Sequence, residues 1–258
     1  MKILAIGDVV GRVSVEYLRK KLYSVRAQLG VDLVIANGEN ASEIHGVTST
    51  DAQGILDSGV DFITLGNHAF RCRDIAELLD SSPYRIIRPA NYPAECPGAG
   101  YSIIRVRGLR VLIINVMGTA FMDPLENPFH TVDRILARES GNYDLSIMDV
   151  HAEATSEKYA LARYFDGKIN VIFGTHTHVA TADEQVLPGG TAYITDIGMT
   201  GPCNGILGTD ADAVIYRMRT NMPSRFKVAD GEIRGSAVLF ELDDNAPYKA
   251  ISVKRIRF

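Results

Sequence analysis

Short apolar runs alternate with amphipathic segments along this chain, and this alternation restricts its fold more than any other feature. After Gly11, apolar side chains recur at spacings of three and four as far as Leu29, which is the period of a helix with one buried face. The expected strands are 3–6, 33–36 and 62–65, and the helices expected after them are 15–29, 51–56 and 74–79. The repeat is close to the ~30 residues of a βαβ unit. Because strands joined by crossover helices run parallel, we predict an α/β fold.

The rest of the chain predicts strands of both directions. The expected hairpins pair 102–106 with 111–116 and 237–242 with 250–256. Turn-forming residues join each pair, Arg107-Gly108 in the first and 243–245 in the second, which favours antiparallel pairing. Two further strands are expected at 145–150 and 171–173. Thr155 or Ser156 is the expected N-cap of the helix between them. No linker interrupts the chain, so we expect one domain over residues 1–258.

The composition excludes several classes of protein. With 46% hydrophobic and 22% charged residues over 258 positions, the chain has the balance of an ordinary globular protein and can bury a sizeable core. The formal net charge is −4, so we expect no binding to long nucleic acids. No segment approaches the ~20 apolar residues of a membrane-spanning helix. We therefore expect no membrane partner either.

The cysteines indicate the compartment. Cys72, Cys96 and Cys203 are an odd number without a Cys-x-x-Cys spacing, which argues against a disulfide framework. The run at 3–6 is too short for the core of a signal peptide. We therefore expect a reducing, cytoplasmic location. Cys203 lies in a glycine-rich segment but has no neighbouring base, so we expect it to have a packing role.

Polar side chains able to bind metal follow five of the expected strands. The clusters are Gly7-Asp8, Asn37-Gly38-Glu39-Asn40, Gly66-Asn67-His68, His151 and Gly174-Thr175-His176-Thr177-His178. Ligand sites of open α/β sheets lie outside the carboxyl ends of the strands. The clusters are therefore expected to meet at one edge, although they are far apart in the sequence.

The residue types in these clusters suit a metal that catalyses hydrolysis. Carboxylates, amides and imidazoles without a thiolate favour iron, manganese or zinc in a hydrolytic site over a structural zinc site. His176 and His178 are one residue apart, which in an extended segment would point both rings to the same side. An aspartate in the position of Asp8 is more often a turn or capping residue when it is considered alone. We predict metal binding because one metal site explains all five clusters together. His45 and His130 have no such placement, and we expect them at the surface or in loops.

The order of these motifs resembles the calcineurin-like metallophosphoesterases. Within them the chain looks closest to the YmdB-like bacterial branch, because 148–158 and 174–183 follow that branch almost residue for residue. The similarity covers nearly the whole chain. Two positions depart from the wider superfamily, Val10 in place of a histidine and Glu39-Asn40 in place of Gly-Asp, and both departures are usual for this branch.

The resemblance implies a fold, a metal site and an activity. The fold would be a two-sheet sandwich flanked by helices (αββα), with mixed parallel and antiparallel strands. One metal ion would be held by Asp8, Glu39, Asn40 and His178, and the other by Glu39, Asn67, His151 and His176. The ions would be iron or manganese, with zinc as a further candidate. The substrates would be 2',3'-cyclic or 3',5'-cyclic nucleotides or related small phosphodiesters.

We expect hydrolysis by a hydroxide that bridges the two metals, with His68 as the general acid that protonates the departing ribose oxygen. Three alternatives stay open: a phosphomonoesterase, a regulatory protein that senses a nucleotide or a metal without turnover, and a hydrolase of amide bonds. The sequence does not decide the native metal. It also leaves open the oligomeric state, a homo-oligomer included.

Overall fold

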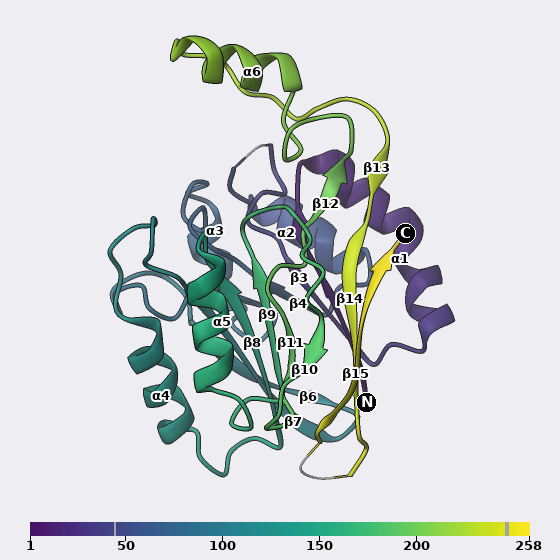
Figure 1. Cartoon of the computed structure of the whole chain (residues 1–258), viewed down its shortest axis with the longest axis vertical. Helices are drawn as coiled ribbons and strands as arrows, with labels where there is room; N and C mark the ends of the chain where they lie inside the picture. Colours follow the sequence, from purple (N-terminus) through teal and green to yellow (C-terminus); the bar gives the residue numbers. More distant parts are fainter. Residues whose placement is uncertain (44, 246–247) are drawn as a thin grey trace.

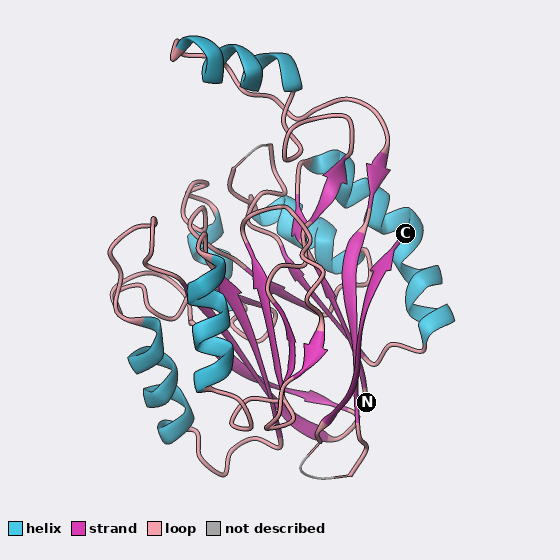
Figure 2. Cartoon of the chain, viewed as in Figure 1, coloured by secondary structure: helices cyan, strands magenta, loops and turns pink. Residues whose placement is uncertain are grey.

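Two six-stranded sheets pack face to face, with helices on both outer faces (Figures 1 and 2). The structure is a computed structural model that describes residues 1–43, 45–245 and 248–258. The first sheet has the order β15 (Ala250–Arg257), β14 (Ser236–Leu242), β1 (Lys2–Ile6), β3 (Leu33–Asn37), β4 (Phe62–Thr64) and β5 (Ile86–Ile87). Strands β1, β3, β4 and β5 run parallel, and β14 is antiparallel to both of its neighbours.

The second sheet has the order β10 (Gln185–Val186), β11 (Ala192–Ile194), β9 (Val171–Thr175), β8 (Leu145–His151), β7 (Leu109–Met117) and β6 (Tyr101–Val106). Strands β7, β8, β9 and β11 run parallel, whereas β6 and β10 are antiparallel edge strands. A small third sheet joins β13 (Ile233–Arg234), β12 (Met199–Pro202) and β2 (Asp8–Val9). The helices are α1 (Arg12–Leu29), α2 (Ser49–Asp57), α3 (Ile75–Ser81), α4 (Pro128–Arg138), α5 (Thr155–Tyr164) and α6 (Ala211–Thr220).

Three apolar layers hold the sandwich together. In β1, Ile3 and Ala5 face the second sheet, whereas Leu4 and Ile6 face the helices α1 to α3, because successive side chains of a strand point to opposite faces. The third layer lies between the second sheet and helices α4 and α5. Central strands are thus buried on both faces, which explains why they are apolar runs without alternation. The predicted αββα fold is confirmed.

Most expected elements are present within two residues of their predicted ends, and both hairpins are antiparallel. The predicted cap of α5 is wrong, since its N-cap is Ala154 and Thr155 is already helical. Part of the second hairpin's turn lies outside the described residues. The sequence patterns did not predict α4, β12 or α6. In the described part of the chain, no helix has the length and apolar character needed to span a membrane.

The segment 203–232, which we call the arm, joins β12 to β13 and carries α6. Figure 1 shows α6 standing away from the two sheets, beyond the end where β12 lies. Only Val214 of this helix is buried. The arm is therefore an extension of the sandwich, and the cavity that it borders is described below.

Candidate metal centre

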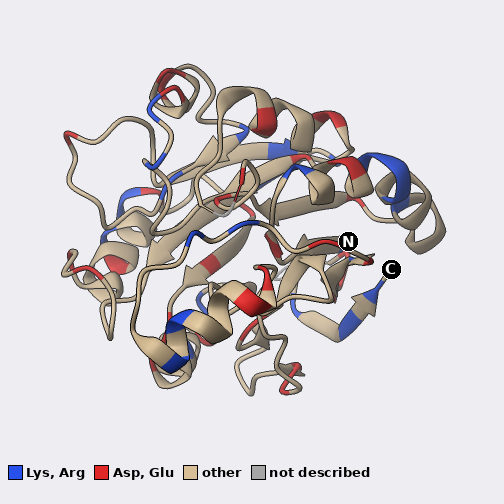
Figure 3. Ribbon diagram, turned by 90° about the horizontal axis from the view of Figure 1, so that it is seen from above, with Lys and Arg blue, Asp and Glu red and all other residues tan. Residues whose placement is uncertain are grey.

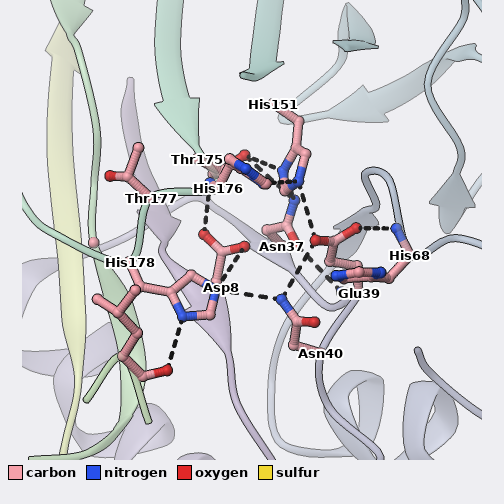
Figure 4. Close-up of polar contacts among 12 residues, drawn as sticks. Asp8, Asn37, Glu39, Asn40, His68, His151, Thr175, His176, Thr177 and His178 are labelled. Carbon is pink, nitrogen blue, oxygen red and sulfur yellow. Dashed lines mark hydrogen bonds and ion pairs between the residues drawn. The ribbon is translucent and has the colours of Figure 1, made fainter. Parts of the chain in front are cut away.

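The seven candidate ligands come together between the ends of strands from both large sheets. Six of them are labelled in Figure 4, and the seventh, Asn67, lies 3.0 Å from His151. Asp8, Glu39, Asn40 and Asn67 follow β1, β3 and β4 of the first sheet, whereas His151, His176 and His178 end or follow β8 and β9 of the second. The expectation of a single sheet edge was therefore wrong. The clusters still meet, because the two sheets pack with these strand ends side by side.

The centre of the cluster is the Nε2 atom of His151, which is completely buried. It lies 3.0 Å from Oε1 of Glu39, 3.0 Å from Oδ1 of Asn67 and 3.1 Å from Nδ1 of His176. The ligand atoms of Glu39, His151 and His176 all lie within 4.8 Å of one another. Spacings near 3 Å are those of neighbouring ligands around an ion bound at roughly 2.1 Å.

The remaining candidates form a second group beside the first. His178 Nε2 lies 3.7 Å from Oδ1 of Asp8 and 3.3 Å from the amide of Asn40, which in turn lies 3.3 Å from Glu39 Oε1. Oδ1 of Asp8 and Oδ1 of Asn40 are buried without a hydrogen-bond partner among the described residues. A buried polar atom without a partner is destabilising. Asp8 Oδ1 belongs to the cluster, whereas Asn40 presents its Nδ2 to Glu39 and His178. Half a turn of the Asn40 amide would bring its oxygen to the same place, so this donor set fits a cation.

Hydrogen bonds fix which imidazole nitrogen faces the cluster. His151 Nδ1 lies 2.9 Å from the hydroxyl of Thr175, which donates to Asp149 Oδ1 at 2.8 Å. The hydroxyl therefore accepts the Nδ1–H of His151, so Nε2 faces the ligands and offers its lone pair to a metal once its own proton is released. His178 is oriented in the same way, because its Nδ1 lies 3.1 Å from the carbonyl of Leu207 and donates to it.

The two histidines after β9 diverge because their backbone is left-handed. His176 has φ 100° and His178 has φ 64°, so the prediction that both rings leave an extended segment on one side is wrong. His176 faces His151, whereas His178 faces Asp8. Thr177 between them donates its N–H (3.2 Å) and its hydroxyl (2.8 Å) to Asp196 Oδ2.

Asp196 is itself held by Lys158, whose Nζ lies 2.6 Å from Asp196 Oδ2, and both side chains are fully buried. Asp196 also accepts the N–H of Gly198 at 2.8 Å. Non-glycine residues in left-handed conformations cost about 1–3 kcal/mol each and persist only where the surroundings fix them. The buried ion pair therefore anchors the turn that separates the two histidines.

The cluster is electrostatically matched to cations. Burial opposes ionisation of Glu39, but the charge and hydrogen bond of His151 outweigh burial and lower the pKa of Glu39 to about 2. Burial also opposes protonation of His151, yet Glu39 and Asp8 raise the pKa of His151 to about 9. Burial raises the pKa of Asp8. A strongly negative potential thus surrounds His151, and metal binding there would release a proton.

His68 lies beside the cluster and not within it. Its backbone N–H donates to Glu39 Oε2 at 2.8 Å, and its Nδ1 accepts from Arg71 Nε at 3.4 Å. The side chain lines a cavity together with Glu39 and His176. Burial lowers the pKa of His68 to about 4. The ring is therefore neutral at pH 7, and both of its nitrogens face side-chain donors: Nδ1 faces Arg71, and Nε2 lies 3.4 Å from the amide nitrogen of Asn67.

Sequence reasoning missed several residues around the centre. His45 is exposed in a loop, as expected, but its ring centroid lies 4.1 Å from that of His68 and it lines the same cavity. Glu153 Oε2 lies 3.1 Å from His176 Nε2. The sequence could have indicated Asp149, because it is a carboxylate inside an apolar strand. His130 is exposed on α4, as predicted. Cys203 does not line the cavity, and its packing role stays a prediction.

Comparison with known proteins gives the family. A family model described as "YmdB-like protein" matches residues 4–256. The chain belongs to this family. It is 42% identical to the "2',3'-cyclic-nucleotide 2'-phosphodiesterase" of Bacillus subtilis over 99% of this chain and 96% of that protein. The resemblance to the YmdB-like branch of the calcineurin-like metallophosphoesterases is thereby confirmed.

Solved structures agree over the whole chain. A protein described as hypothetical from Thermus thermophilus has a TM-score of 0.93 and 39% identity, covering 100% of this chain and 99% of that one. A structure described as a novel phosphatase from Mycoplasma pneumoniae also has a TM-score of 0.93, with 32% identity, and covers 100% of this chain and 93% of that one. The fold of this YmdB-like protein is thus shared with these relatives from end to end.

Proposed function

We propose that this protein is a dinuclear metal-dependent phosphodiesterase that hydrolyses 2',3'-cyclic nucleotides, with 3',5'-cyclic nucleotides and related small phosphodiesters as further candidates. The observation that carries the proposal is the meeting of seven side chains with nitrogen and oxygen donors, two of which, Asp8 and Asn40, have a buried oxygen without a partner. The name of the Bacillus relative supports the choice of ester.

The proposed ligands divide into two sets that share Glu39. One ion is held by Asp8, Glu39, Asn40 and His178, and the other by Glu39, Asn67, His151 and His176. The geometry supports this division, since Glu39 Oε1 lies within 3.3 Å of both Asn40 Nδ2 and His151 Nε2. We propose iron or manganese, with zinc as a further candidate, because the set has no thiolate.

Two divalent cations, once bound, would lower the pKa of a water toward neutrality and clamp the phosphoryl oxygens. Asp8 and Glu39 are the two carboxylates of the set, so two doubly charged ions would leave a net positive centre. This centre attracts a phosphodiester to a protein whose net charge is −4.

His68 acts in this proposal as the general acid for the leaving ribose oxygen. Its side chain faces the cavity and its backbone is tied to Glu39, so its position is fixed relative to the ligands. Since burial lowers its pKa to about 4, the negative charge of the bound phosphodiester has to raise this pKa for proton donation.

The test is a direct comparison of esters by the metal-loaded protein. We expect hydrolysis of 2',3'-cyclic AMP, and loss of this activity after chelation with recovery on adding Mn²⁺ or Fe²⁺. Faster hydrolysis of 3'-AMP than of either cyclic nucleotide would favour a phosphomonoesterase, the second candidate, which the phosphatase name of the Mycoplasma relative supports. Binding of nucleotide without product would favour a sensor.

The proposed substrates are small. In Figure 3 the basic and acidic residues are interspersed over the visible ribbon, without a continuous basic stripe, and long nucleic acids would require one. The single domain over 1–258 and the cytoplasmic location stay predictions of the sequence.

A further inference from the structure

The candidate metal centre opens into a cavity of about 630 Å³ with two chemically different sides. This volume lies within the range of roughly 300–1,000 Å³ typical of small-molecule sites. The polar side includes Glu39, His68 and His178. The other side is apolar and comes from the arm: Ile206, Leu207, Val214, Met218 and Phe226. A ligand whose phosphate reaches the metal centre therefore also has the arm within the same cavity.

Helix α6 presents one face to this cavity. Val214, Arg217, Met218 and Asn221 line it, and they are related by the i, i+3, i+4 and i+7 spacing that places side chains on one side of a helix. Met218 is 75% exposed, so protein does not cover it. Because Figure 1 shows α6 apart from both large sheets, this face does not serve the core and is open to a ligand.

At this side of the cavity, the guanidinium of Arg217 lies over the ring of Phe226. The guanidinium carbon of Arg217 lies 5.2 Å from the centroid of the Phe226 ring, within the ~6 Å of a cation–π contact. Within the described residues, no carboxylate forms an ion pair with Arg217. Aromatic rings and guanidinium planes are the two kinds of side chain on which nucleobases stack.

We propose that the arm binds the base of the substrate, with Phe226 and Arg217 as the stacking surface and Met218 as part of the wall. This inference rests on the proposed function, which it makes more specific. The occupant has to join a phosphodiester at the centre to a flat ring at the arm, and a nucleoside cyclic phosphate has both. Since every base has a π-face, the arm selects for the presence of a base more than for its identity.

The arm also forms a hydrogen bond to a proposed metal ligand, and variants that test base binding have to leave this bond intact. The carbonyl of Leu207 accepts the hydrogen bond that orients His178, so a change at Leu207 would disturb a proposed metal ligand. Phe226 and Met218 have no such bond to the ligands. Substitutions at these two positions therefore test base binding alone.

The experiment compares a substrate with and without its base. Phe226→Ala, Phe226→Tyr and wild-type protein are assayed with 2',3'-cyclic AMP and with methyl β-riboside 2',3'-cyclic phosphate. We expect Phe226→Ala to lower kcat/KM for the nucleotide by roughly 5- to 150-fold, the loss of one stacked base. The methyl riboside should react equally with all three proteins, and Phe226→Tyr should restore the nucleotide rate. Tyr84→Ala, an exposed aromatic outside this cavity, is the matched control.

Two outcomes would overturn base binding at the arm. In the first, Phe226→Ala lowers kcat/KM by the same factor for both substrates; in the second, it changes kcat/KM for neither. If the equal loss comes with a changed elution volume in size-exclusion chromatography, the arm is an interface between copies of the chain. If the wild-type protein hydrolyses neither substrate, the proposed function fails, and calorimetry with 3'-AMP and methyl β-riboside 3'-phosphate decides the base site separately. Weaker binding of 3'-AMP alone to Phe226→Ala supports the site, and equal binding to both proteins overturns it.

Discussion

The two large sheets contribute different chemistry to the candidate centre. The ligands with oxygen donors follow strands of the first sheet, Asp8 as the first residue of the short strand β2, and the imidazole ligands end or follow strands of the second sheet. Three oxygen donors, Asp8, Glu39 and Asn40, are at most 2% exposed, and so is His151 among the imidazoles. The two histidines after β9 are more open, with 21% of the His176 side chain and 14% of the His178 side chain exposed.

This difference shows that neither sheet could form the centre alone. The oxygen donors have fixed positions because their backbone follows directly from buried parallel strands. The imidazoles depend on further contacts, a left-handed turn anchored by Asp196 and a hydroxyl from Thr175. Substitutions on the oxygen side should therefore act through ligand loss, and those on the imidazole side through loss of positioning as well.

The largest effect is expected at Glu39, the donor that the two proposed ions share. Glu39→Ala should abolish binding of both ions and lower kcat by about 10⁴-fold or more, because metal catalysis contributes several kcal/mol to the transition state. His178→Gln, on the imidazole side, should lose one ion and keep the other. Metal analysis of the purified variants checks both stoichiometries. Two bound ions in Glu39→Ala would refute the bridging role.

A second large effect is expected at His68, which belongs to neither ligand set. His68→Ala should lower kcat by about 10²- to 10⁴-fold, the usual contribution of a general acid, while two ions stay bound. His130→Ala, exposed on α4, serves as the control. Should metal content fall in proportion to activity, His68 would be a ligand and not an acid.

The sequence predicted the oxygen side of this comparison better than the imidazole side. Asp8, Glu39 and Asn67 follow buried strands, so a rule about strand ends places them. The turn at His176 and His178 escaped prediction because its cause lies at Asp196, about 20 residues further along the chain. Local spacing carries no information about such a partner.

The arm was missed for a related reason. Hydrophobic periodicity detects a helix through the stripe that it buries against a core, but α6 buries only Val214. One face of α6 lines the cavity and does not pack against a sheet. Similarly, the exposed loop residue His45 reaches the cavity only through tertiary structure.

A third effect concerns the anchor of the imidazole side. Lys158→Met should lower the free energy of unfolding by about 3–5 kcal/mol, because it leaves the charge of Asp196 buried without a partner. Arg134→Met is the matched control. It breaks a pair with Glu126 in which the two side chains are 61% and 45% exposed, so it should cost no more than about 1 kcal/mol. Urea unfolding of the three proteins measures the difference, and equal losses would mean that the buried pair has no special role.

The smallest effect tests the orientation of His151. Thr175→Val keeps the shape of the side chain but removes the hydroxyl that accepts Nδ1–H and links His151 to Asp149. Loss of such a partner typically costs 10- to 100-fold in metal affinity, so we expect weaker binding of Mn²⁺ by that factor in competition with a chelator. Thr131→Val, at another buried threonine, controls for removal of a hydroxyl. If both variants bind Mn²⁺ like the wild type, the hydroxyl does not orient His151, and the strand end alone positions this ring as it does the oxygen donors.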